Sequence, residues 1–312
     1  MSKRVIFFGT PKIAVSCLKA LLDENINVVA VVTKVDKLTG RRQEIQKSEV
    51  KIFAQKHQIT VLQPEKVNDI YDQLISLKPD LFVVCAYGKL IGEKILNIPK
   101  YHCINIHTSL LPRWRGGAPI HYAVLSGDKE SGVSLMYMTK ELDAGNVIYQ
   151  QSITLDINET YCSLYGKLSN LSYRVLRTKI HSLFDTNVQS LAQDSVKVTI
   201  ARNISREDER INWSKKSIQI DRQIRGLFDK PIAYTVYDNM NIKIHEAHVI
   251  TDFTDNQPGE IIDITKSGIK VVCGEKTIIN ITKLQLPGKK AVLVKEMING
   301  NHLFKLNGRF TY

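Results

Sequence analysis

Two polar side chains with the chemistry of acyl transfer lie close together in the middle of the sequence. Asn105 and His107 alternate with isoleucines, a pattern typical of a β-strand. Because side chains alternate between the two faces of a strand, this pair is expected to share one face. The pattern then ends, and a loop with Arg113, Trp114 and Arg115 follows. A polar pair at a strand end, followed by a basic and aromatic loop, indicates a functional site.

An amide, an imidazole and a carboxylate are together suited to moving an acyl group. An amide N–H can hold a developing oxyanion, and an imidazole can take a proton from an attacking nucleophile. A carboxylate beside the imidazole fixes its tautomer, and Asp143 is the candidate for that role. The chain has no G-x-S-x-G nucleophile elbow, which favours direct transfer over a covalent enzyme intermediate.

Each of these residues also has an ordinary structural interpretation. His107 could be a hydrogen-bonded core histidine, and Asn105 could be a turn-forming residue. Asp143 lies in a Leu-Asp-Ala-Gly turn, where aspartate is common for backbone reasons. The occurrence of two such side chains at a spacing of two, before a basic loop, favours the site.

The segments that would position the site alternate between strand and helix patterns. Apolar runs at 4–8, 27–33 and 80–86 are typical of strands buried in a parallel sheet. Gly9 stands alone after the first run, so the G-x-G-x-x-G dinucleotide motif is absent. We therefore expect an α/β fold with a Rossmann-like, mostly parallel sheet, followed by a long amphipathic helix over 160–184.

A second pattern begins after Pro231. Turn signals separate expected strands at 233–237, 242–249, 259–265, 269–272 and 277–286. Closely spaced strands of this kind predict a small OB-like β-barrel. We therefore expect a catalytic domain over residues 1–185, a linker over 186–206 and a C-terminal barrel domain over 207–312.

The chain of 312 residues has a formal net charge of +12, which indicates a polyanionic partner such as nucleic acid. A lysine-rich proteome is the alternative explanation. The end of the predicted barrel is notably basic, and Lys289 and Lys290 are candidates for phosphate contacts there. A barrel surface that is merely solvated is the alternative for this region.

Composition also indicates the cellular compartment of the protein. Five scattered cysteines without a C-x-x-C pair indicate reduced thiols and no metal site. No signal peptide is recognised, and no apolar run reaches membrane-spanning length. We therefore expect a cytoplasmic protein with no membrane partner. We also expect a monomer, although the sequence itself does not show the oligomeric state.

Several motifs resemble the methionyl-tRNA formyltransferases, a family of folate-dependent enzymes. The motifs are Phe8-Gly-Thr-Pro11, Tyr87-Gly88, the segment from Asn105 to Pro119, Gly127-Asp-Lys-Glu-Ser-Gly132, Leu142-Asp-Ala-Gly145, Ile211-Asn-Trp213 and Leu284-Gln-Leu-Pro-Gly-Lys289 with Asn299-Gly300. The similarity covers nearly the whole chain. The central segment is specific for folate-dependent formyltransferases, and the flanking segments point to the tRNA enzymes among them.

The resemblance implies a reaction in which the formyl group of 10-formyltetrahydrofolate passes to the α-amino group of initiator methionyl-tRNA for translation initiation. It implies that Asn105 binds the formyl oxygen and that His107 assists deprotonation of the amine. Asp143 would orient and tune the imidazole. The resemblance implies no metal.

The resemblance also implies a binding region for the folate co-substrate. Ser109, Leu110, Leu111 and Pro112 match the folate-contacting loop of the family. Tyr87 and the backbone beside it are expected to line the pterin pocket.

A basic segment over 34–51 leaves the carboxyl end of a predicted strand, where ligands bind in open α/β sheets. We interpret the segment as a loop, and solvation alone is the alternative role for its charges. The resemblance implies that this loop inserts toward the tRNA acceptor end, with Arg41 and Arg42 as the candidate contacts. It lacks the prolines usual in the family.

Three other functions remain open from the residues alone. A hydrolase that releases formate from the folate would need the same trio. A formyltransferase acting on a small amine would need only one short α/β domain, and this chain is longer. A non-enzymatic RNA-binding protein would keep its function when His107 is changed.

Overall fold

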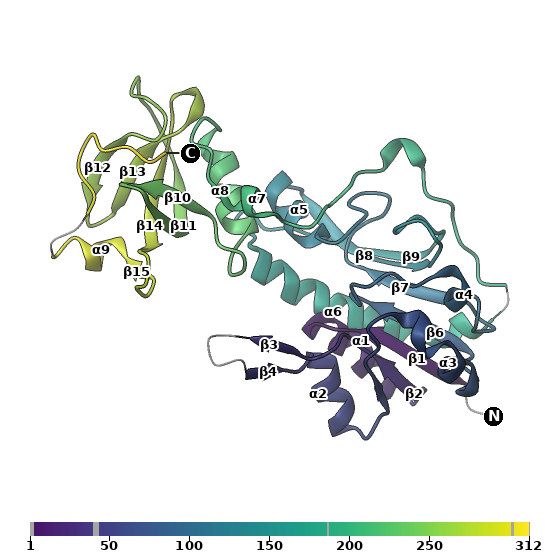
Figure 1. Ribbon diagram of the computed structural model, residues 1–312. Helices are drawn as coiled ribbons and strands as arrows, with labels where there is room; N and C mark the ends of the chain where they lie inside the picture. Colours follow the sequence, from purple (N-terminus) through teal and green to yellow (C-terminus); the bar gives the residue numbers. More distant parts are fainter. Residues whose placement is uncertain (1–2, 40–43, 186, 301–302, 312) are drawn as a thin grey trace. The chain divides into compact units, whose positions relative to one another are not determined.

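A computed structural model describes residues 3–39, 44–185, 187–300 and 303–311 (Figure 1). The chain divides into two compact units. The first unit comprises Met1–Pro119, Glu130–Thr154 and Tyr165–Ala201, and the second comprises Ile120–Lys129, Leu155–Leu164 and Arg202–Tyr312.

The first unit is built on a seven-stranded sheet in the order β5-β2-β1-β6-β7-β8-β9. Its strands are β1 (Arg4–Gly9), β2 (Asn27–Val32), β5 (Val61–Leu62), β6 (Leu81–Cys85), β7 (Cys103–His107), β8 (Glu130–Tyr137) and β9 (Val147–Thr154). The first five strands in this order run parallel, and β8 and β9 pair antiparallel. The prediction of a mostly parallel sheet is therefore confirmed.

Helices cover this sheet because its strands are apolar on both faces. The helical elements in this part of the chain are α1 (Lys12–Asp23), α2 (Glu49–Lys56), η1 (Val67–Ile70), α3 (Tyr71–Ser76), α4 (Glu93–Leu96), α5 (Pro119–Ser126), α6 (Tyr161–Lys179), η2 (Ile180–Phe184) and η3 (Ser195–Lys197). Phe8 of β1 packs in one buried cluster with Leu74 of α3 and Ile95 of α4. None of the helices that the structure describes is long and apolar enough to cross a membrane.

The expected long amphipathic helix is present as α6. Leu168, Leu171 and Val175 recur at intervals of three and four residues and are fully or almost fully buried, which gives the helix one apolar face. The α-helix ends at Lys179, and the single η2 segment continues it to Phe184. The predicted end of the helical region therefore agrees with the structure.

The expectation of a loop over residues 34–51 was wrong in part. β3 (Lys37–Thr39) and β4 (Glu44–Gln46) form a two-stranded antiparallel ribbon. Leu38 and Ile45 face each other in it with 61% and 67% of their surface exposed. The ribbon is held by its own backbone pairing, and its described side chains at 37, 38 and 44–46 are all exposed, so no apolar pattern marked it in the sequence.

The second unit contains an antiparallel sheet in the order β10-β11-β14-β13-β12, with β15 paired to β14. Its strands are β10 (Tyr234–Tyr237), β11 (Met240–Phe253), β12 (Ile261–Thr265), β13 (Gly268–Val272), β14 (Thr277–Gln285) and β15 (Val292–Leu293). The remaining helical elements are α7 (Arg206–Glu209), α8 (Ser217–Gly226), η4 (Gly274–Lys276) and α9 (Val294–Met297). All five predicted strands are confirmed, whereas the short β15 was not predicted.

Aromatic side chains dominate the core of the second unit. Phe310 stacks on Trp213 at 5.5 Å between ring centroids, and Tyr237 meets Phe310 edge-on at 5.4 Å. The indole N–H of Trp213 donates to the hydroxyl of Thr235 at 2.9 Å, so the buried polar atom of the indole has a partner. This packing explains why widely separated segments of the C-terminal half form one core.

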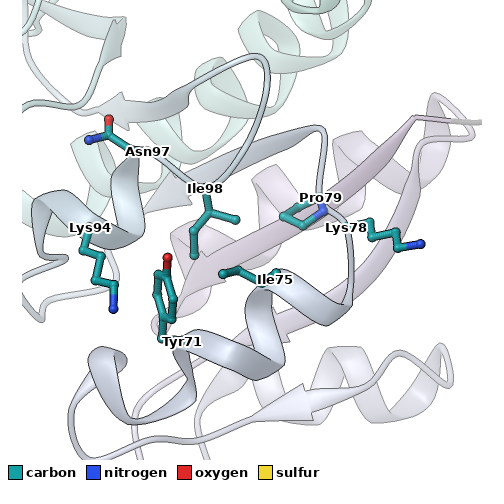
Figure 2. A pocket seen from close by; sticks show the side chains of 7 residues that line it. All are labelled: Tyr71, Ile75, Lys78, Pro79, Lys94, Asn97 and Ile98. Carbon is teal, nitrogen blue, oxygen red and sulfur yellow. The ribbon is translucent and has the colours of Figure 1, made fainter.

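A hollow of about 520 Å³ lies at the amino ends of β6 and β7 in the first unit (Figure 2). Its lining residues are Tyr71, Ile75, Lys78, Pro79, Lys94, Asn97 and Ile98. The carboxyl ends of the same strands lie at the opposite edge of the sheet. This hollow is therefore separate from the Asn105 and His107 pair.

Candidate active site

The candidate active site lies at the carboxyl end of β7. Strand β7 pairs parallel with β6 and antiparallel with β8, so Asn105 lies opposite Val84 and Met136. His107 is the last residue of the strand and lies opposite Ser134. Asn105 and His107 keep 9% and 6% of their surface exposed. The predicted strand is confirmed, and the sheet holds both backbones rigidly.

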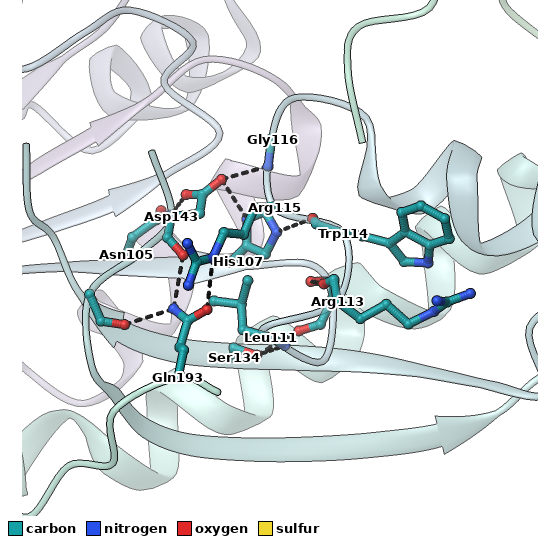
Figure 3. A network of polar contacts seen from close by, with 12 residues as sticks. Asn105, His107, Leu111, Arg113, Trp114, Arg115, Gly116, Ser134, Asp143 and Gln193 are labelled. Carbon is teal, nitrogen blue, oxygen red and sulfur yellow. Dashed lines mark hydrogen bonds and ion pairs between the residues drawn. The ribbon is translucent and has the colours of Figure 1, made fainter. Parts of the chain in front are cut away.

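The Asp143 carboxylate joins the two side chains (Figure 3). The amide Nδ2 of Asn105 donates to Oδ1 of Asp143 at 3.3 Å. Oδ2 lies 3.6 Å from Nδ1 of His107 and accepts the backbone N–H of Gly116 at 2.9 Å. The first of these Oδ2 contacts is longer than a hydrogen bond, and it becomes an attraction between opposite charges only when the ring is protonated. The structure thus brings the three residues of the expected trio together.

The imidazole of His107 lies between two hydrogen-bond acceptors. Its Nε2 is 2.9 Å from the carbonyl oxygen of Trp114, and its Nδ1 faces Asp143. A carbonyl only accepts, so Nε2 carries a hydrogen in this arrangement. A neutral ring supplies one hydrogen and a protonated ring supplies two, so the surroundings can hold the ring after it gains a proton.

The loop after Pro112 adopts a conformation that its glycine permits. Gly116 has φ +118, and a Cβ there would lie 2.5 Å from the carbonyl oxygen of Ala201. Trp114 is also left-handed, with φ 61, and the Arg113 guanidinium lies 4.2 Å from the centre of its ring. The backbone at Gly116 can therefore approach closely enough to donate to Asp143.

The segment from Ser109 to Pro112 is fastened to β8. The hydroxyl of Ser134 donates to the Ser109 carbonyl at 2.6 Å and accepts the Leu111 N–H at 3.1 Å. The Ser109 hydroxyl donates to the Arg113 carbonyl at 2.6 Å. Ser109 and Leu111 are buried, whereas Leu110 and Pro112 are half-buried. The four expected folate-contacting residues therefore form a fixed turn directly after β7.

Tyr87 follows β6 and is 2% exposed. Its ring meets Phe8 edge-on at 5.6 Å, and it shares a buried cluster with Cys103 of β7. Its hydroxyl has no hydrogen-bond partner among the residues that the structure describes. Burial raises the pKa of this hydroxyl to about 12, so the phenol stays neutral at ordinary pH. The Tyr87 carbonyl accepts the hydroxyl of Thr10 at 3.0 Å.

Sequence reasoning missed two side chains that lie against the site. Thr199 accepts the Trp114 N–H at its hydroxyl (2.9 Å), and the Gln193 amide donates to the Asp143 carbonyl at 2.8 Å. Both lie within residues 186–206, the segment predicted to be a linker. Polar residues in a polar stretch have no periodic signal, so nothing in the sequence marked them.

The expected nucleic-acid contacts are placed only in part. Lys289 and Lys290 are exposed in the turn after β14, and the side chain of Gln285 donates to the Lys289 carbonyl at 2.8 Å. Arg41 and Arg42 lie outside the described residues. In the described ranges no group of three or more His, Cys, Asp or Glu side chains could hold a metal ion.

The donor set fits a carbonyl-bearing co-substrate. Asn105 uses one amide hydrogen on Asp143, and its second has no partner among the described residues. A preorganised, partly buried N–H of this kind is what a developing oxyanion requires.

Comparisons with known proteins define the class to which this fold and site belong. The formyl transferase family model matches residues 3–180, and the model of the formyl transferase C-terminal domain matches residues 203–302. The chain is 42% identical to the methionyl-tRNA formyltransferase of Staphylococcus aureus strain MW2 over 299 residues, 95% of this chain and 96% of the relative. It is 41% identical to that of Bacillus cytotoxicus over 302 residues, 96% of each chain. The chain belongs to the methionyl-tRNA formyltransferase family.

Solved structures of more distant proteins share the fold. WlaRD, a sugar 3N-formyl transferase crystallised with dTDP and 5-N-formyl-THF, has a TM-score of 0.65 at 23% identity and covers 93% of this chain and 99% of its own. An N-formyltransferase from Helicobacter canadensis, in complex with folinic acid and dTDP-3-aminofucose, has a TM-score of 0.66 at 21% identity. That likeness covers 90% of this chain and 99% of the other. The architecture is therefore that of N-formyltransferases.

Proposed function

We propose that this chain transfers the formyl group of 10-formyltetrahydrofolate to the α-amino group of initiator methionyl-tRNA. The single observation that carries the proposal is the arrangement of Asn105 and His107 on the two oxygens of Asp143. The curated relatives, named methionyl-tRNA formyltransferases over nearly their whole length, support the choice of substrates. The site supports direct attack of the amine on the formyl carbon.

Asn105 supplies the electrostatic part of catalysis. Its second amide hydrogen would donate to the formyl oxygen and stabilise the negative charge that grows there as the amine attacks. Removal of one such donor typically costs about 3 kcal/mol of transition-state stabilisation. Asp143 holds the amide by its other hydrogen, so the side chain is oriented before the substrates bind.

His107 takes the proton that the amine must lose and returns it to the folate nitrogen, which departs as its bond to the formyl carbon breaks. The reacting nitrogen is Nε2. When methionyl-tRNA binds, the hydrogen of the neutral ring would lie on Nδ1, toward Asp143, and Nε2 would face the substrate amine with a free lone pair in place of the Trp114 carbonyl. Asp143 lies at Nδ1 and stabilises the imidazolium that forms. General-base catalysis by a positioned side chain typically increases a reaction rate by roughly 100- to 10,000-fold.

The folate co-substrate would be held by the turn after β7. Ser109, Leu110, Leu111 and Pro112 follow the strand that carries Asn105 and His107, and the fixed geometry of this turn supports the assignment. Tyr87 would form a buried wall of the pterin pocket. The folate supplies an activated formyl group, and the protein orients it.

We propose the domain division as residues 1–185 for catalysis, 186–206 for the connection and 207–312 for tRNA binding. The C-terminal domain would be an OB-like barrel. Backbone pairing of its last residues with both edges of the sheet supports closure, because Thr311 pairs with Val236 of β10 and Arg309 pairs with Glu260 beside β12. Lys289 and Lys290 would contact tRNA phosphates, as would Arg41 and Arg42 near the acceptor end. A cytoplasmic monomer suits an enzyme of translation initiation.

The decisive experiment follows labelled formyl from 10-formyltetrahydrofolate in three parallel reactions. One contains methionyl-tRNA, one contains a small amino sugar and one has no acceptor. We expect formyl-methionyl-tRNA in the first reaction and little product in the others. Rapid formate release without an acceptor would support a hydrolase, and equal formylation of the sugar would support a small-amine enzyme.

A further inference from the structure

The segment from Leu191 to Ala201, called the strap here, runs across the two loops that carry the site. Leu191 pairs with Val147 of β9 through two backbone hydrogen bonds of 2.8 Å. At the other end, Thr199 and Ala201 bond to both sides of Arg115: the Arg115 N–H donates to the Thr199 carbonyl at 2.9 Å and the Arg115 carbonyl accepts the Ala201 N–H at 2.7 Å. The strap is thus anchored on both sides of Gln193.

Gln193, near the start of the strap, uses its whole amide group in hydrogen bonds (Figure 3). Its Nε2 donates to the carbonyl of Asp143 and to the carbonyl of Gly145, each at 2.8 Å. Its Oε1 accepts from Nε of Arg115 at 2.9 Å. One side chain therefore connects the turn that carries Asp143 with the loop that carries Trp114 and Gly116.

This connection bears on catalysis because Asp143 lies in a partly exposed turn after β8. Leu142 is 68% exposed, and Asp143 has the left-handed φ of 49. The carboxylate must nevertheless direct one oxygen to Asn105 and the other to His107. Small displacements of such a group are costly, since a misplacement of about 1 Å can slow a reaction by roughly 100-fold.

We propose that Gln193 is a positioning residue for formyl transfer. It holds the Asp143 turn at a fixed distance from the Trp114–Gly116 loop, so that the carboxylate meets Asn105, His107 and the Gly116 N–H together. Gln193 does not touch the reacting atoms and acts through Asp143. The kinetic part of this inference rests on the proposed function.

Two substitutions separate its contacts. Gln193→Met keeps the length of the side chain and removes all three hydrogen bonds. Gln193→Glu keeps the acceptor for Arg115 and places a carboxylate oxygen against the Asp143 and Gly145 carbonyls. We expect both variants to lose roughly 10- to 100-fold in kcat with little change in KM for either substrate. An unchanged kcat in both variants would overturn the proposal.

The matched control lies in the same polar stretch. Ser190 accepts a 3.4 Å hydrogen bond from Asn146 at an exposed position. Ser190→Ala should keep the kcat of the unaltered protein. An equal loss of kcat in Ser190→Ala would show that any disturbance of this stretch slows the enzyme, and would overturn a specific role for Gln193.

A double-mutant cycle tests whether the effect passes through Asp143. We expect Gln193→Met to slow the unaltered protein and to cause no further loss in an Asp143→Asn background, because the group that it positions is already gone. Losses that multiply in the double variant would indicate a separate structural effect and would overturn the proposal.

A readout without substrates keeps this inference distinct from the proposed function. The ring-nitrogen NMR resonances of His107 in the free protein should shift in Gln193→Met and remain in place in Ser190→Ala. If the unaltered chain formed no formyl-methionyl-tRNA, the proposed function would fail and the resonances would still decide the role of Gln193. Resonances that are unmoved in Gln193→Met, with the fold intact by thermal melting, would overturn it.

Discussion

One carboxylate organises the site at the scale of single residues. Asp143 divides its two oxygens between the Asn105 amide on one side and the His107 ring and the Gly116 N–H on the other. Because the side chain of Asp143 is only 11% exposed, water screens these contacts weakly. The arrangement couples the orientation of the oxyanion donor to that of the base.

The substitution His107→Ala tests the base. We expect kcat to fall by roughly two orders of magnitude or more, because the amine loses its proton acceptor. His107→Gln should be equally slow. Its amide can still donate to the Trp114 carbonyl, so a loss of kcat in this variant reflects the missing base and not a disturbed loop. Steady-state formylation measures both variants.

The control is an exposed histidine directly before β7, the strand that ends at His107. His102 precedes β7 and lies edge-on to Tyr137 at 5.4 Å. His102→Ala should retain the kcat of the unaltered protein. Near-normal turnover in His107→Ala would reject the role of its imidazole.

The sequence predicted some of these residues and not others for a physical reason. Asn105 and His107 are visible because a strand places alternate side chains on one face. Asp143 was identified by its residue type and by resemblance. Thr199 and Gln193 depend on contacts between distant segments, so no local spacing distinguishes them from other polar residues.

At the scale of elements, a short helix in the second unit is held by an acidic cap. Asp208 of α7 accepts both guanidinium nitrogens of Arg202 at 2.6 Å and the N–H and hydroxyl of Ser205 at 2.7 and 2.8 Å. The Arg202 contact chiefly lowers the pKa of Asp208 to about 2, against the opposing effect of burial. The charged carboxylate therefore stabilises the native state.

We expect Asp208→Asn to lower the free energy of unfolding by about 1 kcal/mol at pH 7, a modest value because Arg202 is 57% exposed. A depressed native pKa contributes stability above the ordinary aspartate value near 4, and this stability is lost as the pH falls toward 2. The difference in the free energy of unfolding between Asp208→Asn and the unaltered protein should therefore decrease as the pH falls below 4. Urea midpoints from Trp213 fluorescence, in a Trp114→Phe background, measure it.

Another acidic residue of the second unit provides the comparison. Asp255 pairs with Lys276 where both side chains are exposed, so Asp255→Asn should change the urea midpoint little. We would reject the assigned role of the Asp208 carboxylate if the difference in urea midpoint between Asp208→Asn and the unaltered protein stayed constant from pH 7 to pH 3.

The sequence predicted long elements better than short ones. The buried strands and α6 were visible because each carries an apolar pattern that burial requires. The β3–β4 ribbon and β15 were not, since two or three residues pair through their backbone without such a pattern. Loop conformations such as that of Gly116 depend on a distant carbonyl and cannot be read locally.

At the scale of the whole molecule, the charge of +12 and the family indicate a large anionic partner. Lys289→Glu together with Lys290→Glu should weaken tRNA binding and reduce the slope of log K against log salt by up to about 2, one for each lost phosphate contact. Filter binding at several salt concentrations measures both effects.

A control with the same change of charge lies at the amino edge of the first unit's sheet. Lys78 and Lys94 are exposed there beside the 520 Å³ hollow (Figure 2). Lys78→Glu with Lys94→Glu should leave the salt slope nearly unchanged. An equal slope in both double variants would remove the Lys289 and Lys290 surface from the tRNA interface.

The most direct test is a single-turnover experiment with labelled 10-formyltetrahydrofolate, excess enzyme and methionyl-tRNA, stopped at short times. We expect the label to pass to the tRNA with no labelled protein at any time, and Asn105→Ala to slow this step by about 100-fold or more. Labelled protein that forms before the product, or an unchanged rate in Asn105→Ala, would contradict direct transfer assisted by the Asn105, His107 and Asp143 cluster.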